Sequence, residues 1–528
     1  MSSSDTILDE VISARRNSVA DVLHRTAQRL PAKTALIAAD RSISFRELDA
    51  AVDAVAGALD ARGVRRGDRL AIFSRNNWQF VVLNYATARL GVILVPINFM
   101  LTADEVAFIF GNSEISALVV ESEFLATAEK ALVAYGRPLS AKAVIGATDD
   151  TTWEEFSAWL TGGETAPEVI VGDDDPIRIM YTSGTESRPK GALLSNRALI
   201  AEYTSCIVDG GMTADDIDLH TLPLYHCAQL DCFLGPDVYL GATSIILPGP
   251  DPDAILAAIE THGVTKFFAP PTVWISLLRS PNLDRTDLSS LRKGYYGASA
   301  MPVEVLREIR ERLPQVKLWN LYGQTELAPV ATILGPEDQE SHPGSAGRPV
   351  LNVETVVVDE NNVVLPAGEI GEVAHRSPQA TLGYWRDPER TADAFRGGWF
   401  HSGDLGYFDG DGRLTIVDRK KDMIKTGGEN VASREVEEAI YLHPDVAEVA
   451  VFAIPHPKWV EAVCAVVVSK PDRSLDEKAV RAHCVNRLAG FKIPKHFVVV
   501  DTLPKNPSGK ILKRDLRTTF ADLATKEH

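Results

Sequence analysis

The most informative segment of this chain reads Tyr181-Thr-Ser-Gly-Thr-Glu-Ser-Arg-Pro-Lys-Gly191, and it follows the apolar run 177–180. Small hydroxyl residues, a glycine and a lysine in one turn supply N–H donors, O–H donors and a positive charge, which a polyphosphate requires. The segment is not a Walker A loop, because Lys190 follows Pro189 and Gly191 stands where that motif needs Ser or Thr. An ordinary turn rich in Gly, Ser and Thr is the alternative. The segment alone therefore indicates a phosphate site without proving one.

Helical and strand-like segments alternate around this loop. The helical segments are 45–62 and 81–90, and the strand-like segments are 69–73, 91–96, 117–120, 244–247 and 266–269. This alternation is typical of an α/β fold with parallel-type sheets layered with helices. A chain of 528 residues with 45% hydrophobic residues exceeds what one core usually supports, so we expect two or more domains.

The character of the chain changes after Asp418. Arg-Lys-Lys-Asp is followed there by Thr426-Gly427-Gly428, a short charged and flexible joint. We therefore predict a large N-terminal domain over residues 1–418 and a small C-terminal domain over residues 419–528. The small domain has 19 basic and 15 acidic residues, a formal charge of +4, whereas the rest has 35 and 57, a charge of −22. Such a domain is suited to approach phosphates held on the larger one, although undirected variation of surface charge explains the difference equally well.

Overall composition excludes some classes of function. A formal charge of −18 and a pI near 5.2 argue against nucleic acid as a partner, because phosphate backbones need a basic face. The acidic, polar N-terminus does not resemble a secretory signal, and no apolar run reaches the length of a transmembrane segment. We expect a cytoplasmic protein.

The cysteines number five and form no Cys-x-x-Cys pair, which fits reduced thiols. Cys227 and Cys232 lie near His220 and His226 in the sequence, but their spacing matches no zinc motif. We therefore favour buried or pocket thiols over a metal site.

Four further motifs carry polar chemistry. They are Asn320-Leu-Tyr-Gly-Gln-Thr-Glu326, His401-Ser-Gly-Asp-Leu405, Gly427-Gly-Glu-Asn-Val431 and Pro504-Lys-Asn-Pro-Ser-Gly-Lys510. The first combines an aromatic ring, a glycine, a hydroxyl and a carboxylate, which together can stack on a base, contact phosphate and hold Mg²⁺. A turn followed by an acidic helix start explains that motif equally well in isolation.

The order and spacing of these motifs from Tyr181 to Lys510 resemble the adenylate-forming superfamily of acyl-CoA synthetases, adenylation domains and beetle luciferases. The similarity is greatest to bacterial fatty-acyl-CoA synthetases. It implies a large adenylation domain, a small mobile α+β domain, and the use of ATP, Mg²⁺ and coenzyme A. The implied reaction is adenylation of a carboxylic acid with release of pyrophosphate, followed by thioester formation with CoA. A medium or long fatty acid is the favoured substrate, and a homodimer is expected.

The resemblance also assigns roles to residues of the large domain. Thr182, Ser183, Gly184, Thr185 and Lys190 resemble the triphosphate loop. Gly297, Ala298 and Ser299 resemble the segment that lines the adenine and acyl pockets. The motif 320–326 also contains Gly323 and Gln324 and is expected to bind the nucleotide. In it, Tyr322 is expected to stack on adenine and Thr325 to contact the α-phosphate. Glu326 is expected to bind Mg²⁺ together with Thr185. Asp404 and Arg419 match the residues that hold the ribose. His226 matches a histidine beside the acyl group, and the alternative for it is an ordinary half-buried histidine.

Roles in the small domain follow in the same way. Lys421 aligns with the hinge, and Lys510 with the lysine that assists adenylation. Gly427 and Gly428 are expected beside the pantetheine arm, where a side chain would obstruct the thiol. Trp459 resembles an aromatic residue near the CoA nucleotide, but core packing explains it equally well.

One departure from the family pattern affects the phosphate loop. Glu186 and Ser187 stand where the family usually has Thr or Ser and then Gly. A carboxylate beside a triphosphate is repulsive unless it pairs with Arg188, so this loop predicts weaker ATP binding.

Several alternatives remain open at this stage. They are an aryl-CoA ligase, an acyl-AMP ligase that loads a carrier protein, an amino-acid adenylation domain and a non-catalytic nucleotide-binding protein. Retention of Lys510 argues against the last of these.

Overall fold

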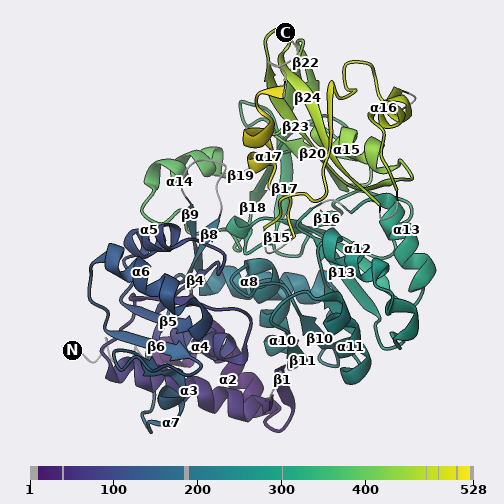
Figure 1. Cartoon of the computed structure of the whole chain (residues 1–528). Helices are drawn as coiled ribbons and strands as arrows, with labels where there is room; N and C mark the ends of the chain where they lie inside the picture. The colour runs from purple at the N-terminus through teal and green to yellow at the C-terminus, as the bar shows by residue number, and fades with distance from the viewer. Residues whose placement is uncertain are drawn as a thin grey trace.

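The computed structural model describes residues 10–38, 41–182, 189–299, 301–470, 473–485, 487–506 and 509–523. Two large sheets with their helices form the lower part of the molecule, and the small C-terminal domain lies above them (Figure 1).

The first large sheet has the strand order β7-β6-β5-β3-β4-β8-β9. Its strands are β3 (Arg69–Phe73), β4 (Ile93–Ile97), β5 (Ala117–Glu121), β6 (Ala141–Ile145), β7 (Glu154–Glu155), β8 (Pro176–Thr182) and β9 (Lys190–Ser195). Its helices are α3 (Phe45–Ala61), α4 (Trp78–Leu90), α5 (Ala103–Ser113), α6 (Leu125–Tyr135) and α7 (Phe156–Thr161). The strands run parallel except β9, which pairs antiparallel with β8. The phosphate-loop segment therefore connects two neighbouring antiparallel strands.

The second large sheet has the order β16-β15-β14-β13-β12-β10-β11-β1-β2. Its strands are β1 (Thr34–Ala38), β2 (Arg41–Ser44), β10 (Ile217–His220), β11 (Thr243–Ile246), β12 (Lys266–Phe268), β13 (Lys293–Gly297), β14 (Lys317–Gly323), β15 (Val330–Leu334) and β16 (Arg348–Pro349). Its helices are α2 (Val19–Arg29), α8 (Asn196–Asp209), α9 (Cys227–Gln229), α10 (Gly235–Leu240), α11 (Pro252–His262), α12 (Pro271–Arg279) and α13 (Val303–Arg312). The central strands are parallel, and both edges are antiparallel.

A third sheet, β17-β18-β19-β20, is antiparallel throughout. It contains β17 (Glu354–Val358), β18 (Gly371–Arg376), β19 (Phe400–Phe408) and β20 (Leu414–Arg419), and α14 (Pro388–Ala394) precedes β19. The alternation of helices and strands did not predict this sheet.

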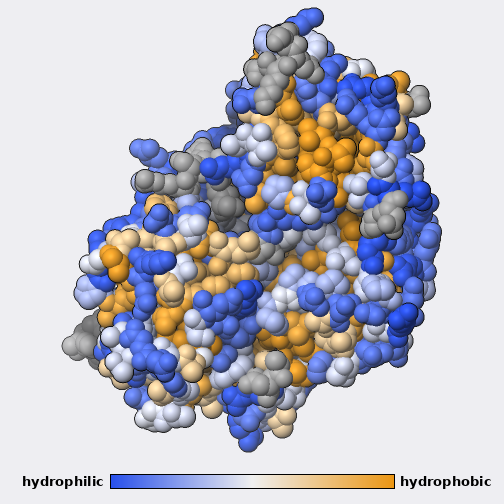
Figure 2. Space-filling view, in the orientation of Figure 1, coloured by the Kyte–Doolittle hydropathy of each residue, from blue (hydrophilic) through white to orange (hydrophobic). Residues whose placement is uncertain are grey.

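The small domain is a sheet with helices on both faces. Its strands are β21 (Ile424–Thr426), β22 (Glu429–Val431), β23 (Val446–His456), β24 (Val460–Ser469) and β25 (His496–Val499), and its helices are α15 (Ser433–Tyr441), α16 (Glu477–Val485) and α17 (Lys513–Phe520). One apolar core lies on the side of α15 and α16, and a second lies on the side of α17. Hydrophobic residues remain visible over β23 and β24 in the surface view (Figure 2).

Local sequence explains where several elements begin. The Ser44 hydroxyl accepts from the Glu47 N–H while the Glu47 side chain accepts from the Ser44 N–H, so α3 begins with a capping box. The Asn77 side chain accepts from the Phe80 N–H and caps α4, so this helix begins at Trp78 and not at residue 81 as predicted. Gly91 ends α4 in the left-handed conformation that glycine adopts without strain.

The predicted fold class is confirmed: a large N-terminal α/β domain carries a small α+β C-terminal domain. The large sheets are mixed at their edges and not purely parallel. The boundary at residue 418 stays a prediction; β20 ends at Arg419 and the strands of the small domain begin at Ile424. None of the described helices combines the length and the hydrophobicity that crossing a bilayer requires.

Candidate active site

The ends of β13 and β14 bring two predicted segments together. The two strands are parallel with Gly297 beside Leu321, so Ala298 and Ser299 follow next to Tyr322. A Cβ on Gly323 would lie 1.9 Å from the Pro329 carbonyl oxygen, so only glycine fits there. This close approach folds the 320–326 motif back on itself and presents its side chains at the strand end.

Tyr322, Asp404 and Arg419 form one polar group. The Tyr322 hydroxyl donates to Asp404 Oδ2 at 2.7 Å, and Arg419 Nε lies 3.4 Å from Asp404 Oδ1. Asp404 and Arg419 are direct partners across β19 and β20. Burial raises the pKa of Asp404 and the charge of Arg419 opposes that rise. The carboxylate is therefore a buried acceptor of the kind that binds two adjacent hydroxyls.

Lys190, Glu326 and Tyr384 form a second polar group. Lys190 Nζ lies 3.0 Å from Glu326 Oε1 and donates to the Tyr384 hydroxyl at 2.6 Å. The Tyr384 hydroxyl in turn donates to Glu326 Oε1 at 2.8 Å. Sequence reasoning missed Tyr384, although the Gly-Tyr-Trp segment 383–385 offered an aromatic signal.

His226 lies at the start of α9 beside the 320–326 motif. The next residue, Cys227, donates its thiol hydrogen to the Thr325 hydroxyl at 3.4 Å, which ties the two segments together. His226 Nε2 is shielded from solvent and has no hydrogen-bond partner among the described residues. Burial, and then the charge of Lys510, lowers the pKa of His226 to about 4. The imidazole is therefore neutral at neutral pH, and the described residues leave the hydrogen-bonding capacity of its Nε2 unused.

Lys510 reaches this site from the small domain. Its loop rests on the start of α12, where the Thr272 hydroxyl donates to the Gly509 carbonyl at 3.4 Å. Lys510 keeps solvent-accessible surface, but the protein packed around it disfavours the charged ammonium. This desolvation, and then repulsion from Arg419 and Lys421, lowers the pKa of Lys510 to about 8. The structure thus places Lys510 near residues of the large domain that precede it by hundreds of positions.

The predicted CoA residues lie together but apart from the residues described above. The Gly427 N–H donates to the Trp459 carbonyl at 3.0 Å, and Trp459 stacks on His456 with the ring centroids 4.2 Å apart. Gly427 and Gly428 form the tight turn between β21 and β22, and both have positive φ angles, which favours glycine. This hairpin lies at the end of the small domain far from the large sheets (Figure 1).

The structure gives no contact that tests the predicted role of several other residues. Ser183, Gly184 and Thr185, and with them Glu186 to Arg188, lie outside the described residues. Thr182 is the last residue of β8, and Lys421 lies in the turn between β20 and β21. The Gln324 side-chain nitrogen is buried without a hydrogen-bond partner among the described residues. Thr272 was not anticipated, because its role comes from a contact with the small domain.

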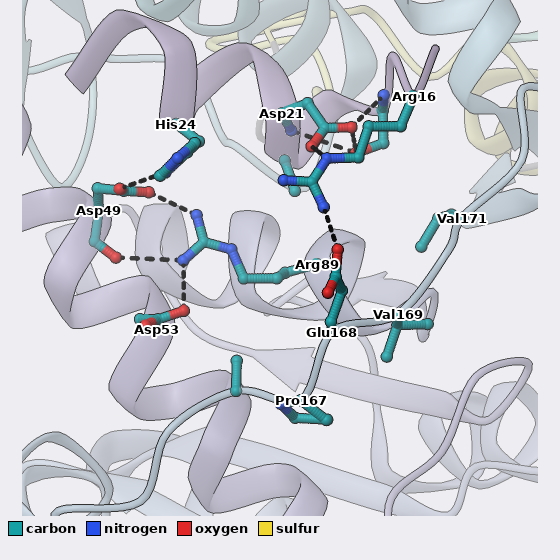
Figure 3. Close-up of a pocket in the computed structure, with 13 residues that line it drawn as sticks. Arg16, Asp21, His24, Asp49, Asp53, Arg89, Pro167, Glu168, Val169 and Val171 are labelled. Atoms are coloured by element: carbon teal, nitrogen blue, oxygen red, sulfur yellow. Dashed lines mark hydrogen bonds and ion pairs between the residues drawn. The ribbon is translucent and has the colours of Figure 1, made fainter. Parts of the chain in front are cut away.

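Two other polar clusters contain none of the predicted site residues. A cavity of about 300 Å³ lies beside α2, where Arg89 pairs with Asp49 and Asp53, and Arg16 with Asp21 (Figure 3). Its charged groups thus satisfy one another.

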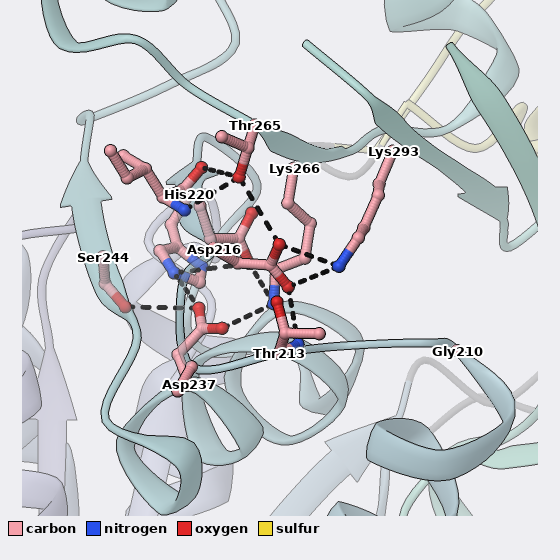
Figure 4. A network of polar contacts seen from close by, with 12 residues as sticks. Gly210, Thr213, Asp216, His220, Asp237, Ser244, Thr265, Lys266 and Lys293 are labelled. Carbon is pink, nitrogen blue, oxygen red and sulfur yellow. Dashed lines mark hydrogen bonds and ion pairs between the residues drawn. The ribbon is translucent and has the colours of Figure 1, made fainter. Parts of the chain in front are cut away.

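The second cluster is buried under β10, β11 and β12 (Figure 4). Asp218, His220 and Asp237 lie close enough together to suggest a metal site, but Lys266 Nζ is 3.2 Å from Asp218 and 2.5 Å from Asp237. Burial disfavours the charge of Lys266, yet attraction to these two carboxylates outweighs it and raises the lysine pKa. An ammonium already occupies the place between the two carboxylates where a metal ion would bind.

Comparison with known families agrees with the site geometry. Residues 23–385 match the family model described as AMP-binding enzyme, and residues 435–510 match the AMP-binding enzyme C-terminal domain. The chain belongs to the AMP-binding, adenylate-forming enzyme family. The predicted resemblance is thereby confirmed.

Relatives of this adenylate-forming enzyme include ligases for different acids. The chain is 35% identical to a feruloyl-CoA synthase of Amycolatopsis over 94% of this chain and 98% of the relative. It is 32% identical to the long-chain-fatty-acid–CoA ligase FadD13 of Mycobacterium tuberculosis over 92% of this chain and 95% of the relative. Among solved structures, the anthranilate CoA ligase AuaEII in complex with anthranoyl-AMP superposes with a TM-score of 0.90 at 29% identity, over 98% and 99% of the two chains. The predicted enzyme class, an AMP-forming acid–thiol ligase, is confirmed.

The donor chemistry at Glu326 fits the Mg²⁺ that such enzymes use with ATP. Mg²⁺ prefers oxygen ligands and usually takes one or two carboxylates together with substrate phosphates. Among the described residues, the polar contacts of the Glu326 carboxylate go to Oε1 and leave Oε2 for another ligand. Glu326 is therefore a suitable protein ligand for this ion.

Proposed function

We propose that this chain activates a carboxylic acid with ATP as an acyl-adenylate and then transfers the acyl group to coenzyme A. The observation that supports this most strongly is the position of Lys510. A lysine of the small domain lies within electrostatic reach of His226 and Asp404, which the large domain contributes. A binding protein without catalysis has no need of a cation delivered there by a second domain.

In the first step, a carboxylate oxygen of the acid attacks the α-phosphorus of ATP. A P–O bond to the acid forms, the bond to the β-phosphate oxygen breaks, and pyrophosphate leaves. Lys510 provides positive charge where negative charge develops, and Lys190 holds the phosphates at the other end. Mg²⁺ held by Glu326 would neutralise phosphate charge. Neutral His226 supplies a ring nitrogen toward the acyl group.

Nucleotide recognition follows from the polar group of Tyr322, Asp404 and Arg419. Tyr322 offers an aromatic face for the adenine, next to the segment 297–299. Asp404, with Arg419 beside it, accepts hydrogen bonds from the two ribose hydroxyls. This arrangement orients the α-phosphate toward Lys510 and Thr325.

In the second step, the CoA sulfur attacks the acyl carbon and AMP leaves. The candidate CoA residues Gly427, Gly428 and Trp459 are remote from Lys510 in this conformation. We infer that the small domain turns about the Arg419–Lys421 joint, which withdraws Lys510 and brings the glycine hairpin to the cleft. Lys495 and Lys458 lie over the Trp459 ring, 5.1 and 5.6 Å from its centroid, and add positive charge for the CoA phosphates.

The acid belongs to one of two classes. A medium or long fatty acid is our first candidate, on the basis of the sequence resemblance and the mostly apolar segment after His226. An aryl acid is the second, because the relative named for feruloyl-CoA is slightly more similar than the relative named for long-chain fatty acids.

A panel of fatty, aryl and amino acids tests this proposal. Each acid is incubated with Mg²⁺ and ATP, with and without CoA, and pyrophosphate and thioester are measured. Fatty or aryl acids should release pyrophosphate and form the CoA thioester. Pyrophosphate without CoA thioester, together with acylation of a carrier protein, would identify an acyl-AMP ligase instead. No pyrophosphate with any acid would refute the enzymatic proposal.

A further inference from the structure

Tyr384 links the two charged side chains of the proposed triphosphate and metal site. Its hydroxyl accepts a hydrogen bond from Lys190 and donates one to Glu326, and both charged groups also contact each other. The Tyr384 ring also lies under the lysine, with Nζ 4.3 Å from the ring centroid. Tyr384 is buried and the Glu326 side chain is only 6% exposed, whereas the Lys190 side chain is 29% exposed. The hydrogen bond between Tyr384 and Glu326 is therefore shielded from bulk water, which strengthens it.

The backbone around Tyr384 is fixed to both neighbouring elements. The Leu193 N–H of β9 donates to the Gly383 carbonyl, and the Trp385 N–H donates to the Gly191 carbonyl at 2.8 Å. On the other side, the Thr381 N–H donates to the main-chain carbonyl of Glu326 at 2.7 Å. Segment 381–385 therefore holds the strand of Lys190 and the turn of Glu326 at the same time.

Further contacts hold the main chain at Tyr384 and the neighbouring Trp385. The Tyr384 N–H donates to the Thr391 hydroxyl at 2.9 Å, and the Trp385 indole N–H donates to the Asn112 carbonyl at 3.0 Å. With the main chain held, the hydroxyl is placed by its own hydrogen bonds with Lys190 and Glu326. Groups that orient a metal-binding carboxylate in this manner affect metal affinity without touching the metal.

We propose that Tyr384 is a positioning residue that prepares Glu326 and Lys190 for the Mg²⁺ complex of ATP. This inference rests on the proposed function. Tyr384 holds Glu326 by Oε1 and leaves Oε2 for the Mg²⁺ that Glu326 would hold. Lys190 pairs with the Glu326 carboxylate in this structure; with the Mg²⁺ complex of ATP bound, the ion would supply that positive charge and Lys190 would be free to contact the phosphates. Tyr384 retains its hydrogen bond to Glu326 throughout this exchange.

The test compares Tyr384→Phe with wild type in the full chain. The phenyl ring preserves the packing and the face toward Lys190, and only the hydroxyl is lost. Binding of α,β-methylene-ATP, which cannot transfer AMP to the acid because its α–β bridge is not cleaved, is measured by calorimetry with and without Mg²⁺. We expect the Mg²⁺-dependent affinity to fall by about tenfold, the usual scale for groups that orient a metal ligand. Binding without Mg²⁺ and thioester formation from synthetic acyl-adenylate should change little.

A matched control and a double variant separate this role from a general effect. Tyr135→Phe also removes a tyrosine hydroxyl, which donates to the Ile115 carbonyl at 2.8 Å on the outer helix α6, and it should leave Mg²⁺-dependent binding unchanged. If Tyr384 acts through Glu326, the double variant Tyr384→Phe/Glu326→Gln should bind the Mg²⁺ complex of α,β-methylene-ATP no more weakly than Glu326→Gln alone.

Equal Mg²⁺-dependent affinity of wild type and Tyr384→Phe would overturn the positioning role, whatever the activity. A fall of equal size without Mg²⁺ would also overturn it, because the hydroxyl would then serve the nucleotide or the fold. Failure of the proposed function gives a different result. Wild type would then release no pyrophosphate with any acid, while wild type and Tyr384→Phe would still differ in Mg²⁺-dependent binding of α,β-methylene-ATP.

Discussion

Replacing Lys510 with alanine should abolish most of the adenylation step and leave the second step intact. Lys510 lies where its charge interacts with Arg419, Lys421, Asp404 and His226, so its ammonium acts on the residues of the candidate active site. A donor that stabilises charge only in the transition state typically contributes about 3–4 kcal/mol, or two to three orders of magnitude in rate. We therefore expect acid-dependent pyrophosphate release to fall by about 100- to 1,000-fold.

The same substitution should not destabilise the fold. The two nearest cations repel the Lys510 ammonium and contribute to its lowered pKa, so its removal relieves a like-charge interaction. The thermal midpoint of Lys510→Ala should therefore equal or exceed that of wild type. Lys505→Ala is a matched control, because Lys505 comes from the same loop but pairs with Glu448 at 2.6 Å within the small domain. This control should retain adenylation.

The pH dependence gives a second measurement of the same group. With a pKa of about 8, Lys510 is protonated below that pH and loses its charge as the pH rises through it. Adenylation by wild type should therefore decline above about pH 8. Lys510→Arg, whose guanidinium stays charged at these values, should lose activity overall but show no such decline.

The assay separates the two half-reactions. Pyrophosphate release reports adenylation, and thioester formation from CoA and synthetic acyl-adenylate reports transfer. In Lys510→Ala we expect pyrophosphate release to be nearly lost, with little change in thioester formation from acyl-adenylate. Equal loss of both, or adenylation that persists in Lys510→Ala, would refute the role of Lys510 and the domain rotation that depends on it.

Three further predictions concern the joint, the CoA surface and the core. Lys421→Pro restricts the backbone of the joint, so thioester formation should slow while acyl-adenylate still accumulates; equal slowing of both steps would contradict a hinge there. Trp459→Ala should raise the KM for CoA in the transfer assay without changing pyrophosphate release, and an unchanged KM would remove Trp459 from the CoA site. Arg178→Met leaves the charge of the fully buried Asp231 unpaired and should lower the free energy of unfolding in urea by about 3–5 kcal/mol. Arg178→Met/Asp231→Leu should recover most of that loss.

Local patterns in the sequence predicted much of the fold. The apolar run 69–73 became the strand β3, because a strand that is buried on both faces has a continuous apolar sequence. The amphipathic run 45–62 became α3, because its helical periodicity gives one buried side. The antiparallel edges and the sheet β17–β20 were not predicted. Pairing direction depends on which strands meet in space, and hydrophobic alternation carries no information about that.

The sequence by itself also identified the family and most candidate residues of the site, because motifs such as 320–326 keep their chemistry within a few positions. Only the tertiary structure showed that Tyr384 completes the pair of Lys190 and Glu326, since its hydroxyl contacts a lysine 194 positions away. Likewise, the contact of Gly509 with Thr272 spans 237 positions and holds the loop of Lys510 against the large domain. The first contact requires that distant segments of the large domain pack together, and the second requires that the two domains do. The free energy of that packing comes from the whole core and not from the local segment.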